Sequence, residues 1–155
     1  MIGFITNHSF LDNPTFSGMR QSLLESFDRI YLLNLHGSSR RGSYDDENVF
    51  DIQQGVAISI FIKTKKSNDK KVFYADLSGL REDKYKWLDS HTIKNVDWQE
   101  INPVSSNYFF VPKNTSLEEK YNKFWKITDI FHLYSTGIVT AKDDFIIDFN
   151  KDALH

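Results

Sequence analysis

Four short runs of apolar residues, separated by polar segments, dominate the first half of the chain. They cover residues 2–6, 29–35, 55–63 and 72–77. Nearly continuous apolar runs of this length, bounded by turn-forming residues, are typical of strands that are buried on both faces. The pattern predicts four buried strands, and we expect residues 2–6, 30–35 and 56–62 to be neighbours in a single sheet.

Between the first two runs, the apolar residues follow the spacing of a helix. Asn13-Pro14-Thr15 is a typical helix start. The apolar positions then repeat every three or four residues, at Phe16, Met19, Leu23, Leu24 and Phe27. The polar face is expected to carry Arg20, Gln21 and Glu25. This predicts a helical crossover between the first two strands, while the Lys-rich turn 63–71 predicts a hairpin between the last two.

After Gly79 the pattern becomes mixed. It predicts helices at residues 80–90 and 116–125, the second opened by a capping-box pattern of Ser116 and Glu119. It also predicts short strands at residues 96–101, 108–111, 137–140 and 145–149, and leaves residues 127–133 ambiguous. The fold class is therefore α/β, mixed α+β towards the C-terminus, with a boundary between residues 1–78 and residues 79–155.

Composition narrows the class of protein. Aromatic residues make up 15% of the 155 residues, which is enough apolar surface for a packed core. The net charge of −2 counts against a self-sufficient nucleic-acid-binding domain, because such domains are usually basic. The absence of cysteine excludes disulfides and fits a reducing cytoplasm. No apolar run approaches the about 20 residues that span a bilayer, so we expect no membrane segment.

Several short segments of the chain form a colinear set. In order they are Gly3-Phe4-Ile5-Thr6-Asn7, Met19-Arg20-Gln21-Ser22-Leu23-Leu24, Leu35-His36-Gly37, Val49-Phe50-Asp51-Ile52, Gly55-Val56-Ala57-Ile58, Tyr74-Ala75-Asp76-Leu77, Phe110-Val111-Pro112 and Thr136-Gly137-Ile138-Val139-Thr140. Together they resemble the stretch that follows the catalytic Asn-Pro-Pro-Tyr motif in adenine-specific (N6) DNA methyltransferases of type IIG and single-chain type I restriction-modification enzymes. The resemblance covers nearly the whole chain, and its specificity lies in the order of the segments.

This resemblance implies the later strands of a Rossmann-like sheet, followed by a connector to a target-recognition region. In the family, S-adenosylmethionine and a flipped-out adenine bind at the carboxyl edge of the sheet. The cofactor loop and the Asn-Pro-Pro-Tyr motif are absent here, because Asn13-Pro14 and Asn102-Pro103 lack the second proline and the tyrosine. We therefore expect no catalytic residue, no bound cofactor and no activity from this chain alone.

The resemblance also implies the partners of the chain. They are duplex DNA, contacted through the intact enzyme, and the missing N-terminal half of the methyltransferase domain. A severed sheet edge would also allow pairing with a second copy of the chain. Two alternatives stay open from the residues themselves: a stand-alone nucleic-acid or protein interaction module, and an unrelated small α/β protein.

Phe61 is the first candidate site residue. Strand alternation puts Ala57, Ser59 and Phe61 on one face and Val56, Ile58 and Ile60 on the other. By resemblance, Phe61 would stack on the extruded base. The alternative, which we favour, is a core phenylalanine packed beneath a helix.

Asn7, His8 and Ser9 follow the first strand, so they should lie at the carboxyl edge of the sheet, beside the pocket. The alternative is that Asn7 and Ser9 make only local backbone hydrogen bonds.

Basic residues form the third group of candidates. Arg40, Arg41, Lys63, Lys65 and Lys66 would contact the DNA backbone, or else are solvated loop charges. The five histidines lack the spacing of metal ligands. Asp76 with Glu82-Asp83-Lys84 resembles a magnesium nuclease pattern only faintly, and we interpret Glu82-Asp83-Lys84 as the solvated face of a helix.

Overall fold

The computed structural model describes residues 1–38, 45–64, 70–114 and 116–133. The chain divides into two compact units, Met1–Lys113 and Asn114–His155. Residues 79–113 therefore pack in the same unit as the strands that precede them, although the sequence pattern placed a boundary after residue 78. The assignment of the later residues to a connector stays a prediction.

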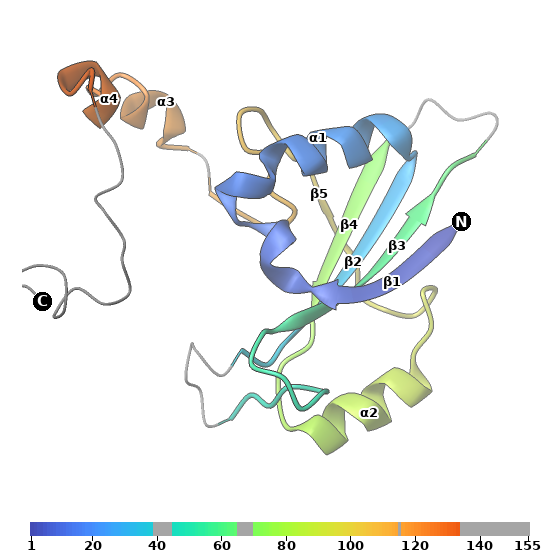
Figure 1. The fold of residues 1–155 in the computed structure, drawn as a ribbon. Coiled ribbons are helices and arrows are strands. Elements are labelled where there is room, and N and C mark those ends of the chain that lie inside the picture. The colour runs from blue at the N-terminus through green and yellow to red at the C-terminus, as the bar shows by residue number, and fades with distance from the viewer. Residues whose placement is uncertain (39–44, 65–69, 115, 134–155) are drawn as a thin grey trace, which may run out of the picture. The chain divides into compact units, whose positions relative to one another are not determined.

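The first unit is built on a five-stranded mixed sheet (Figure 1). Its strands are β1 (Ile2–Asn7), β2 (Arg29–His36), β3 (Val56–Ile62), β4 (Lys71–Asp76) and β5 (Gln99–Ile101), in the spatial order β1-β3-β2-β4-β5. β3 is antiparallel to both β1 and β2, β4 is parallel to β2, and β5 is antiparallel to β4. The predicted α/β class is confirmed, and so is the prediction that the first three strands are neighbours in one sheet.

The predicted hairpin between β3 and β4 is wrong, because these strands lie on opposite sides of β2. Asp28, the residue before β2, explains the crossing. Its backbone N–H donates to the carbonyl of Ile62 at the end of β3, and its own carbonyl accepts from Lys71 at the start of β4, both at 2.9 Å. Its carboxylate also accepts hydrogen bonds from the backbone N–H and the hydroxyl of Thr64. Asp28 therefore fastens the end of β3 and the start of β4 on either side of β2.

Helices cover both faces of the sheet. On one face, α1 (Ser17–Ser26) and the short 3₁₀ turns at His8–Leu11 and Pro14–Phe16 enclose one core. This core contains Phe10, Leu11, Ile30, Leu32, Ala57, Phe61, Val72, Tyr74 and Phe110. On the other face, Trp87 and Leu88 of α2 (Arg81–Ser90) pack against Leu33, Leu35, Val49 and Val56. The predicted alternation of β3 is confirmed, since Ala57 and Phe61 belong to the first core and Val56 and Ile58 to the second.

Strand β1 departs from the prediction in its burial. All six of its residues are exposed, and Ile2, Phe4 and Ile5 retain 45%, 52% and 54% of their accessible surface. The physical reason is its place at the edge of the sheet, where β3 is its one strand neighbour among the described residues. β1 therefore has the composition of an interior strand and the position of an edge strand.

Arg20 was expected on the polar face of α1, and this expectation is wrong, because the side chain is fully buried. Its guanidinium donates to the carbonyls of Phe10 at 2.6 Å and Asn13 at 2.8 Å. It also donates twice to the carbonyl of Asn107, at 2.9 and 2.7 Å. The segment around Asn107 thus lies against α1 and supplies acceptors that helical periodicity cannot reveal.

The later elements are shorter than predicted. The strand predicted at residues 96–101 covers only Gln99–Ile101, and residues 108–111 form no strand. In the second unit, the described residues contain α3 (Glu118–Tyr121) and α4 (Ile127–Ile130). The strands predicted at residues 137–140 and 145–149 lie outside the described residues. Within the described ranges, no helix has both the length and the apolar character needed to cross a bilayer.

Candidate functional site

The carboxyl ends of β1, β2 and β4 meet at one edge of the sheet, because these three strands run in the same direction. A hollow of about 490 Å³ lies at this edge. It is lined by His8, Ser9, Asp12, Asn13, Pro14, Asn34, His36, Tyr74 and Val111. His8 and Ser9 follow β1, and Asn34 and His36 close β2. Open α/β sheets bind ligands at such edges, so this hollow is the candidate site.

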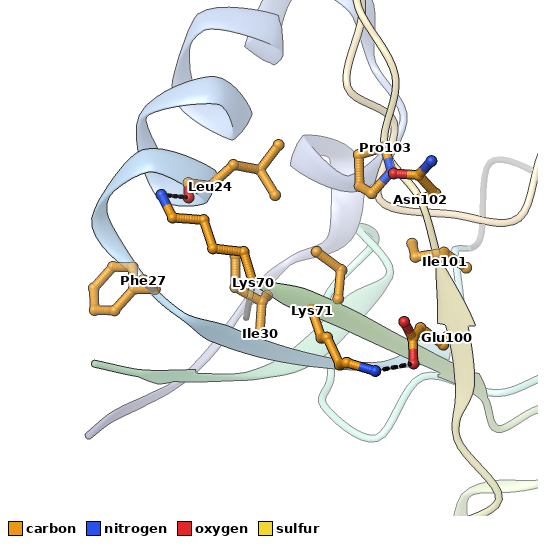
Figure 2. Close-up of a pocket in the computed structure, with 10 residues that line it drawn as sticks. Leu24, Phe27, Ile30, Lys70, Lys71, Glu100, Ile101, Asn102 and Pro103 are labelled. Atoms are coloured by element: carbon orange, nitrogen blue, oxygen red, sulfur yellow. Dashed lines mark hydrogen bonds and ion pairs between the residues drawn. The ribbon is translucent and has the colours of Figure 1, made fainter. Parts of the chain in front are cut away.

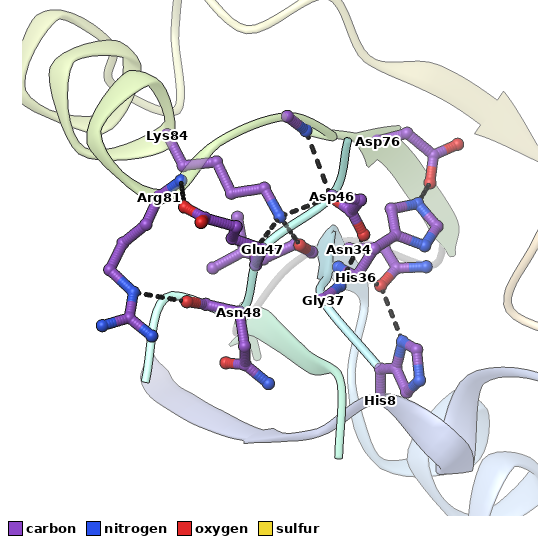
Figure 3. A network of polar contacts seen from close by, with 12 residues as sticks. His8, Asn34, His36, Gly37, Asp46, Glu47, Asn48, Asp76, Arg81 and Lys84 are labelled. Atoms are coloured by element: carbon purple, nitrogen blue, oxygen red, sulfur yellow. Dashed lines mark hydrogen bonds and ion pairs between the residues drawn. The ribbon is translucent and has the colours of Figure 1, made fainter. Parts of the chain in front are cut away.

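A chain of hydrogen bonds runs through the wall of the hollow, partly shown in Figure 3. The Nδ1 atom of His8 lies 3.0 Å from Oδ1 of Asn34, which also accepts the backbone N–H of His36 at 3.1 Å. Nδ2 of Asn34 donates to the Tyr74 hydroxyl at 3.1 Å, and this hydroxyl donates to Oδ1 of Asp76 at 2.6 Å. Nε2 of His36 contacts the same Oδ1 atom at 2.5 Å. Residues of β2, of β4 and of the turn that follows β1 are thus joined into one polar network.

The electrostatics of the network fix its protonation. Burial, and then the hydrogen bond to the neighbouring carboxylate, raise the pKa of Tyr74 well above its ordinary value. Burial also tends to raise the pKa of Asp76, but the hydrogen bonds from His36 and Tyr74 outweigh it and leave the pKa below its usual value. At neutral pH the Tyr74 hydroxyl therefore keeps its proton, and Asp76 is an ionised acceptor.

Gly55 permits the close packing of this wall. A Cβ atom at Gly55 would stand 2.5 Å from Cε1 of His8 and 2.7 Å from the carbonyl oxygen of His36. The backbone N–H of His8 also donates to the Gly55 carbonyl at 2.9 Å. Only glycine lets the start of β3 lie this close to the imidazole.

A second polar cluster fixes the loop that precedes β3. Lys84 of α2 is fully buried, and its ammonium donates to the carbonyls of Leu35 and Glu47 at 2.7 and 2.6 Å. It also forms an ion pair with Asp46 at 2.6 Å (Figure 3). The interpretation of Lys84 as part of a solvated helix face is therefore wrong. The physical reason is that β2 supplies one carbonyl beside α2, and the loop after β2 supplies a second carbonyl and a carboxylate.

Asp46 and Gly37 complete this cluster. The Asp46 carboxylate accepts the backbone N–H groups of Gly37 at 2.7 Å and Gly79 at 3.1 Å. Burial tends to raise the pKa of Asp46, yet the contacts with Lys84 and the two N–H groups lower it overall. Gly37 has φ of +75°, and a Cβ there would stand 2.4 Å from Cα of Asn48. The turn after β2 thus requires glycine.

α2 holds the rest of the loop through its outer side chains. Nε of Arg81 donates to the carbonyl of Asn48 at 2.7 Å, and its guanidinium pairs with Asp51 at 2.8 Å. The Tyr85 hydroxyl donates to the carbonyl of Val49 at 2.5 Å. The segment Val49-Phe50-Asp51-Ile52 is therefore a folded loop beside the sheet edge.

The predicted site residues lie in different environments. Phe61 is 4% exposed in the core beneath α1, with its ring centroid 5.2 Å from that of Phe27. This agrees with the core interpretation, and base stacking by Phe61 stays a prediction. Asn7 does not line the hollow but accepts the backbone N–H of Ser9 at 2.8 Å, as the local interpretation expected. His8 and Ser9 line the hollow, and their role as a pocket wall stays a prediction.

Lys63 has an exposed side chain whose ammonium lies 3.6 Å from the Asp28 carboxylate. Arg40, Arg41, Lys65 and Lys66 lie outside the described residues, so DNA contact by the basic group also stays a prediction. Within the described ranges, no group of three or more His, Asp or Glu side chains is arranged to hold a metal ion.

A second hollow, of about 560 Å³, lies at the amino ends of β2 and β4 (Figure 2). Its two lysines already have partners within the protein. Lys70 donates to the carbonyls of Leu24 and Glu25 at 2.8 and 2.9 Å, which caps the end of α1. Lys71 pairs with Glu100 at 3.1 Å. These contacts account structurally for its charged side chains, so we place the candidate site at the carboxyl edge.

Sequence reasoning missed Asn34 and Tyr74. Asn34 is the one amide in the eight-residue strand β2, and it is 6% exposed. Such a polar residue in a buried strand needs hydrogen-bond partners, and this was the available signal. The partners themselves could not be read from the sequence, because Asn34 and Tyr74 lie 40 positions apart.

Comparison with known proteins gave no matching family model and no matching curated protein. The similar solved structures include three protein–DNA complexes. A nuclease-deletion mutant of the Type ISP restriction-modification enzyme LlaGI, in complex with a DNA substrate mimic, has 31% identity and a TM-score of 0.66, over 76% of this chain and 12% of that one. The ATP-dependent Type ISP restriction-modification enzyme LlaBIII, bound to DNA, has 33% identity and a TM-score of 0.64, over 76% and 9%.

The third similar structure is the DrdV–DNA complex, with 28% identity and a TM-score of 0.60, over 69% of this chain and 11% of that one. At these identities the similarity extends beyond the fold to the residues themselves. The chain spans only 9% to 12% of the length of these proteins.

Proposed function

We propose that this chain, as a relative of one segment of restriction-modification enzymes, is the later part of the methyltransferase domain of such an enzyme. The intact protein would transfer a methyl group from S-adenosylmethionine to adenine N6 in duplex DNA. The colinear segments of the sequence support this proposal, as does the similarity to Type ISP restriction-modification enzymes.

The open edge of β1 is the observation that carries the proposal. Phe4 lies on the α1 face, where its ring centroid is 6.4 Å from that of Phe61. Ile5 pairs with Ile58, which belongs to the opposite core. Both faces of β1 are therefore apolar and half exposed, although edge strands are usually short, charged or covered. If β1 lies in the interior of a larger sheet, its apolar faces are covered. The preceding part of a methyltransferase domain would supply the further strands of that sheet.

In this proposal, the hollow at the carboxyl edge is the part of the active site to which this chain contributes. In the proposed enzyme, the preceding part of the domain supplies the Asn-Pro-Pro-Tyr motif and the loop that holds the cofactor. This chain supplies a wall of the pocket, through His8 and Ser9, and no catalytic residue. Arg40, Arg41, Lys63, Lys65 and Lys66 would add positive charge towards the DNA backbone.

Methyl transfer by the intact enzyme is the direct test. Labelled S-adenosylmethionine is incubated with duplex DNA and either the intact enzyme or the 155-residue chain. The nucleosides are then separated after digestion. We expect label in N6-methyladenine with the intact enzyme and none with the chain alone. Label in cytosine, no label with the intact enzyme, or turnover by the chain alone would each contradict the proposal.

Hydrogen exchange tests the sheet extension independently of activity. In the isolated chain, the β1 amides that face β3 should be protected and those that face outwards should exchange freely. In the intact enzyme, all non-terminal β1 amides should be protected. Free exchange of the outward amides in the intact enzyme would show that β1 is a true edge.

The second unit favours a second candidate, a protein interaction module. Its described residues leave large apolar side chains exposed, including Leu117 at 69%, Tyr121 at 76% and Trp125 at 82%. Exposed apolar side chains gathered in one segment are typical of a surface that another chain covers. Stable self-association of the isolated chain, with no methyl transfer by the intact protein, would favour this candidate.

A further inference from the structure

Residues 107–113 form an exit segment, from which the chain passes into the second unit at Asn114. Residues 102–113 contain no helix or strand, so other contacts must hold this part of the chain in place. The guanidinium of Arg20 donates two hydrogen bonds to the carbonyl of Asn107, at 2.9 and 2.7 Å. A fully buried cation of α1 therefore holds the start of the exit segment.

The middle and the end of the exit segment are held as well. The Phe110 side chain is fully buried in the core on the α1 face, with its ring edge-on to that of Phe10. Its backbone N–H donates to the carbonyl of Leu11 at 2.8 Å. At the end, the ammonium of Lys113 lies 3.6 Å from the centroid of the Phe109 ring, which is a cation–π contact. The exit segment thus has contacts along its whole length.

The exit segment also belongs to the wall of the hollow at the carboxyl edge. Val111 lines this hollow, and so does Asn13, whose carbonyl accepts from the Arg20 guanidinium at 2.8 Å. One side chain therefore holds both a part of the wall and the segment by which the chain leaves the first unit. A shift of the exit segment away from Arg20 would also shift Val111 in the wall.

We propose that Arg20 is a positioning residue, which keeps the exit segment beside the hollow and so limits how far the following part of the enzyme can move from it. This inference rests on the proposed methyltransferase, in which the chain continues into a target-recognition region. Sequence reading and methyl transfer then occur a fixed number of base pairs apart on the DNA. Because Arg20 is fully buried, it keeps this spacing through the exit segment and not by contact with DNA.

Hydrogen exchange in the 155-residue chain tests the attachment. Arg20→Lys keeps a buried cation but loses the planar fork of donors. We expect the Phe110 amide to be protected in the wild type and to exchange about 10–100-fold faster in Arg20→Lys, relative to the amides of β2, as for the loss of hydrogen bonds to a charged group. The control Leu33→Val weakens the core on the α2 face, so it should accelerate the Phe110 and β2 amides alike.

The positions of methylated adenines in the intact enzyme test the role. The wild type should methylate one adenine at a fixed place in its recognition sequence. Arg20→Lys should lower kcat about 10–100-fold with little change in KM for DNA, since small misplacements of a reacting group cost this much. It should also methylate adenines displaced from that place. Leu33→Val should keep the wild-type place, which a general loss of stability cannot distinguish from Arg20→Lys by rate alone.

Three results would overturn the inference. They are an unprotected Phe110 amide in the wild type, the same pattern of accelerated exchange in both variants, and methylation by Arg20→Lys at the wild-type place alone. In these cases methyl transfer by the wild-type enzyme would still stand. If the wild-type enzyme transfers no methyl group, the proposed function fails and the positioning role fails with it, whereas hydrogen exchange still decides whether Arg20 holds the exit segment.

Discussion

Replacement of Lys84 by methionine should destabilise the first unit strongly. Methionine keeps much of the buried stem and removes the ammonium, which makes three hydrogen bonds of 2.6 to 2.7 Å. The Asp46 side chain, which is only 19% exposed, then loses its counterion, and the carbonyls of Leu35 and Glu47 lose a donor. Removing one partner of a buried ion pair costs about 3–5 kcal/mol, and we expect Lys84→Met to lie in that range.

Urea unfolding followed by tryptophan fluorescence measures this loss, because Trp87 and Trp98 pack against the core on the α2 face. Lys86→Met, at a side chain that is 76% exposed, is the matched control and should change the free energy of unfolding by less than about 0.5 kcal/mol.

A double-mutant cycle tests the reason for the loss. The substitution Asp46→Asn removes the carboxylate charge that Lys84 neutralises. Lys84→Met combined with Asp46→Asn should therefore cost about 1–3 kcal/mol less than the sum of the single substitutions. A loss below about 1 kcal/mol for Lys84→Met, or strict additivity in the cycle, would refute the argument that the buried pair holds the loop on α2.

Three further predictions use the same unfolding assay. Gly55→Ala should destabilise the protein by about 1–3 kcal/mol, because its Cβ would stand 2.5 Å from His8. The control Gly18→Ala meets nothing within 4 Å and should be neutral or stabilising. Equal effects of the two substitutions would contradict the close approach. Stability should be fully present above the ordinary carboxyl pKa of 3.8 and fall as the pH drops through the lowered pKa values of Asp46 and Asp76; a urea midpoint unchanged in acid would argue against this. Arg20→Met should cost at least about 2 kcal/mol by leaving buried carbonyls without a donor, and a neutral result would mean that water replaces the guanidinium.

The sequence was sufficient for the strands and for much of their arrangement. Continuous apolar runs located β1 to β4, and the expectation that the first three are neighbours in one sheet is confirmed. The burial of Arg20 and Lys84 could not be predicted, because their acceptors are backbone carbonyls and a carboxylate supplied by segments remote in the sequence. Charge and helical spacing place such residues in solvent by default. Only the folded structure shows which hydrogen-bond acceptors lie beside them.

The prediction of a hairpin between β3 and β4 was wrong for a related reason. Loop length permits both a hairpin and a crossing, and the choice depends on Asp28, whose backbone and carboxylate hold the end of β3 and the start of β4 around β2. Only part of the candidate site was predictable from the sequence. The position of His8 after a strand placed it at the carboxyl edge, whereas its link to Tyr74 through Asn34 depends on strand register.

The insertion of β3 between β1 and β2 has a consequence for biosynthesis. β1 and β2 leave the ribosome before β3, yet β3 lies between them in the sheet that the described strands form. Ile2 pairs with Phe61, so β1 must wait for more than fifty residues before its hydrogen bonds with β3 can form. Long-range pairings of this kind slow folding and prolong the exposure of apolar strands. A nascent chain stalled before Val56 would therefore be a substrate for chaperones.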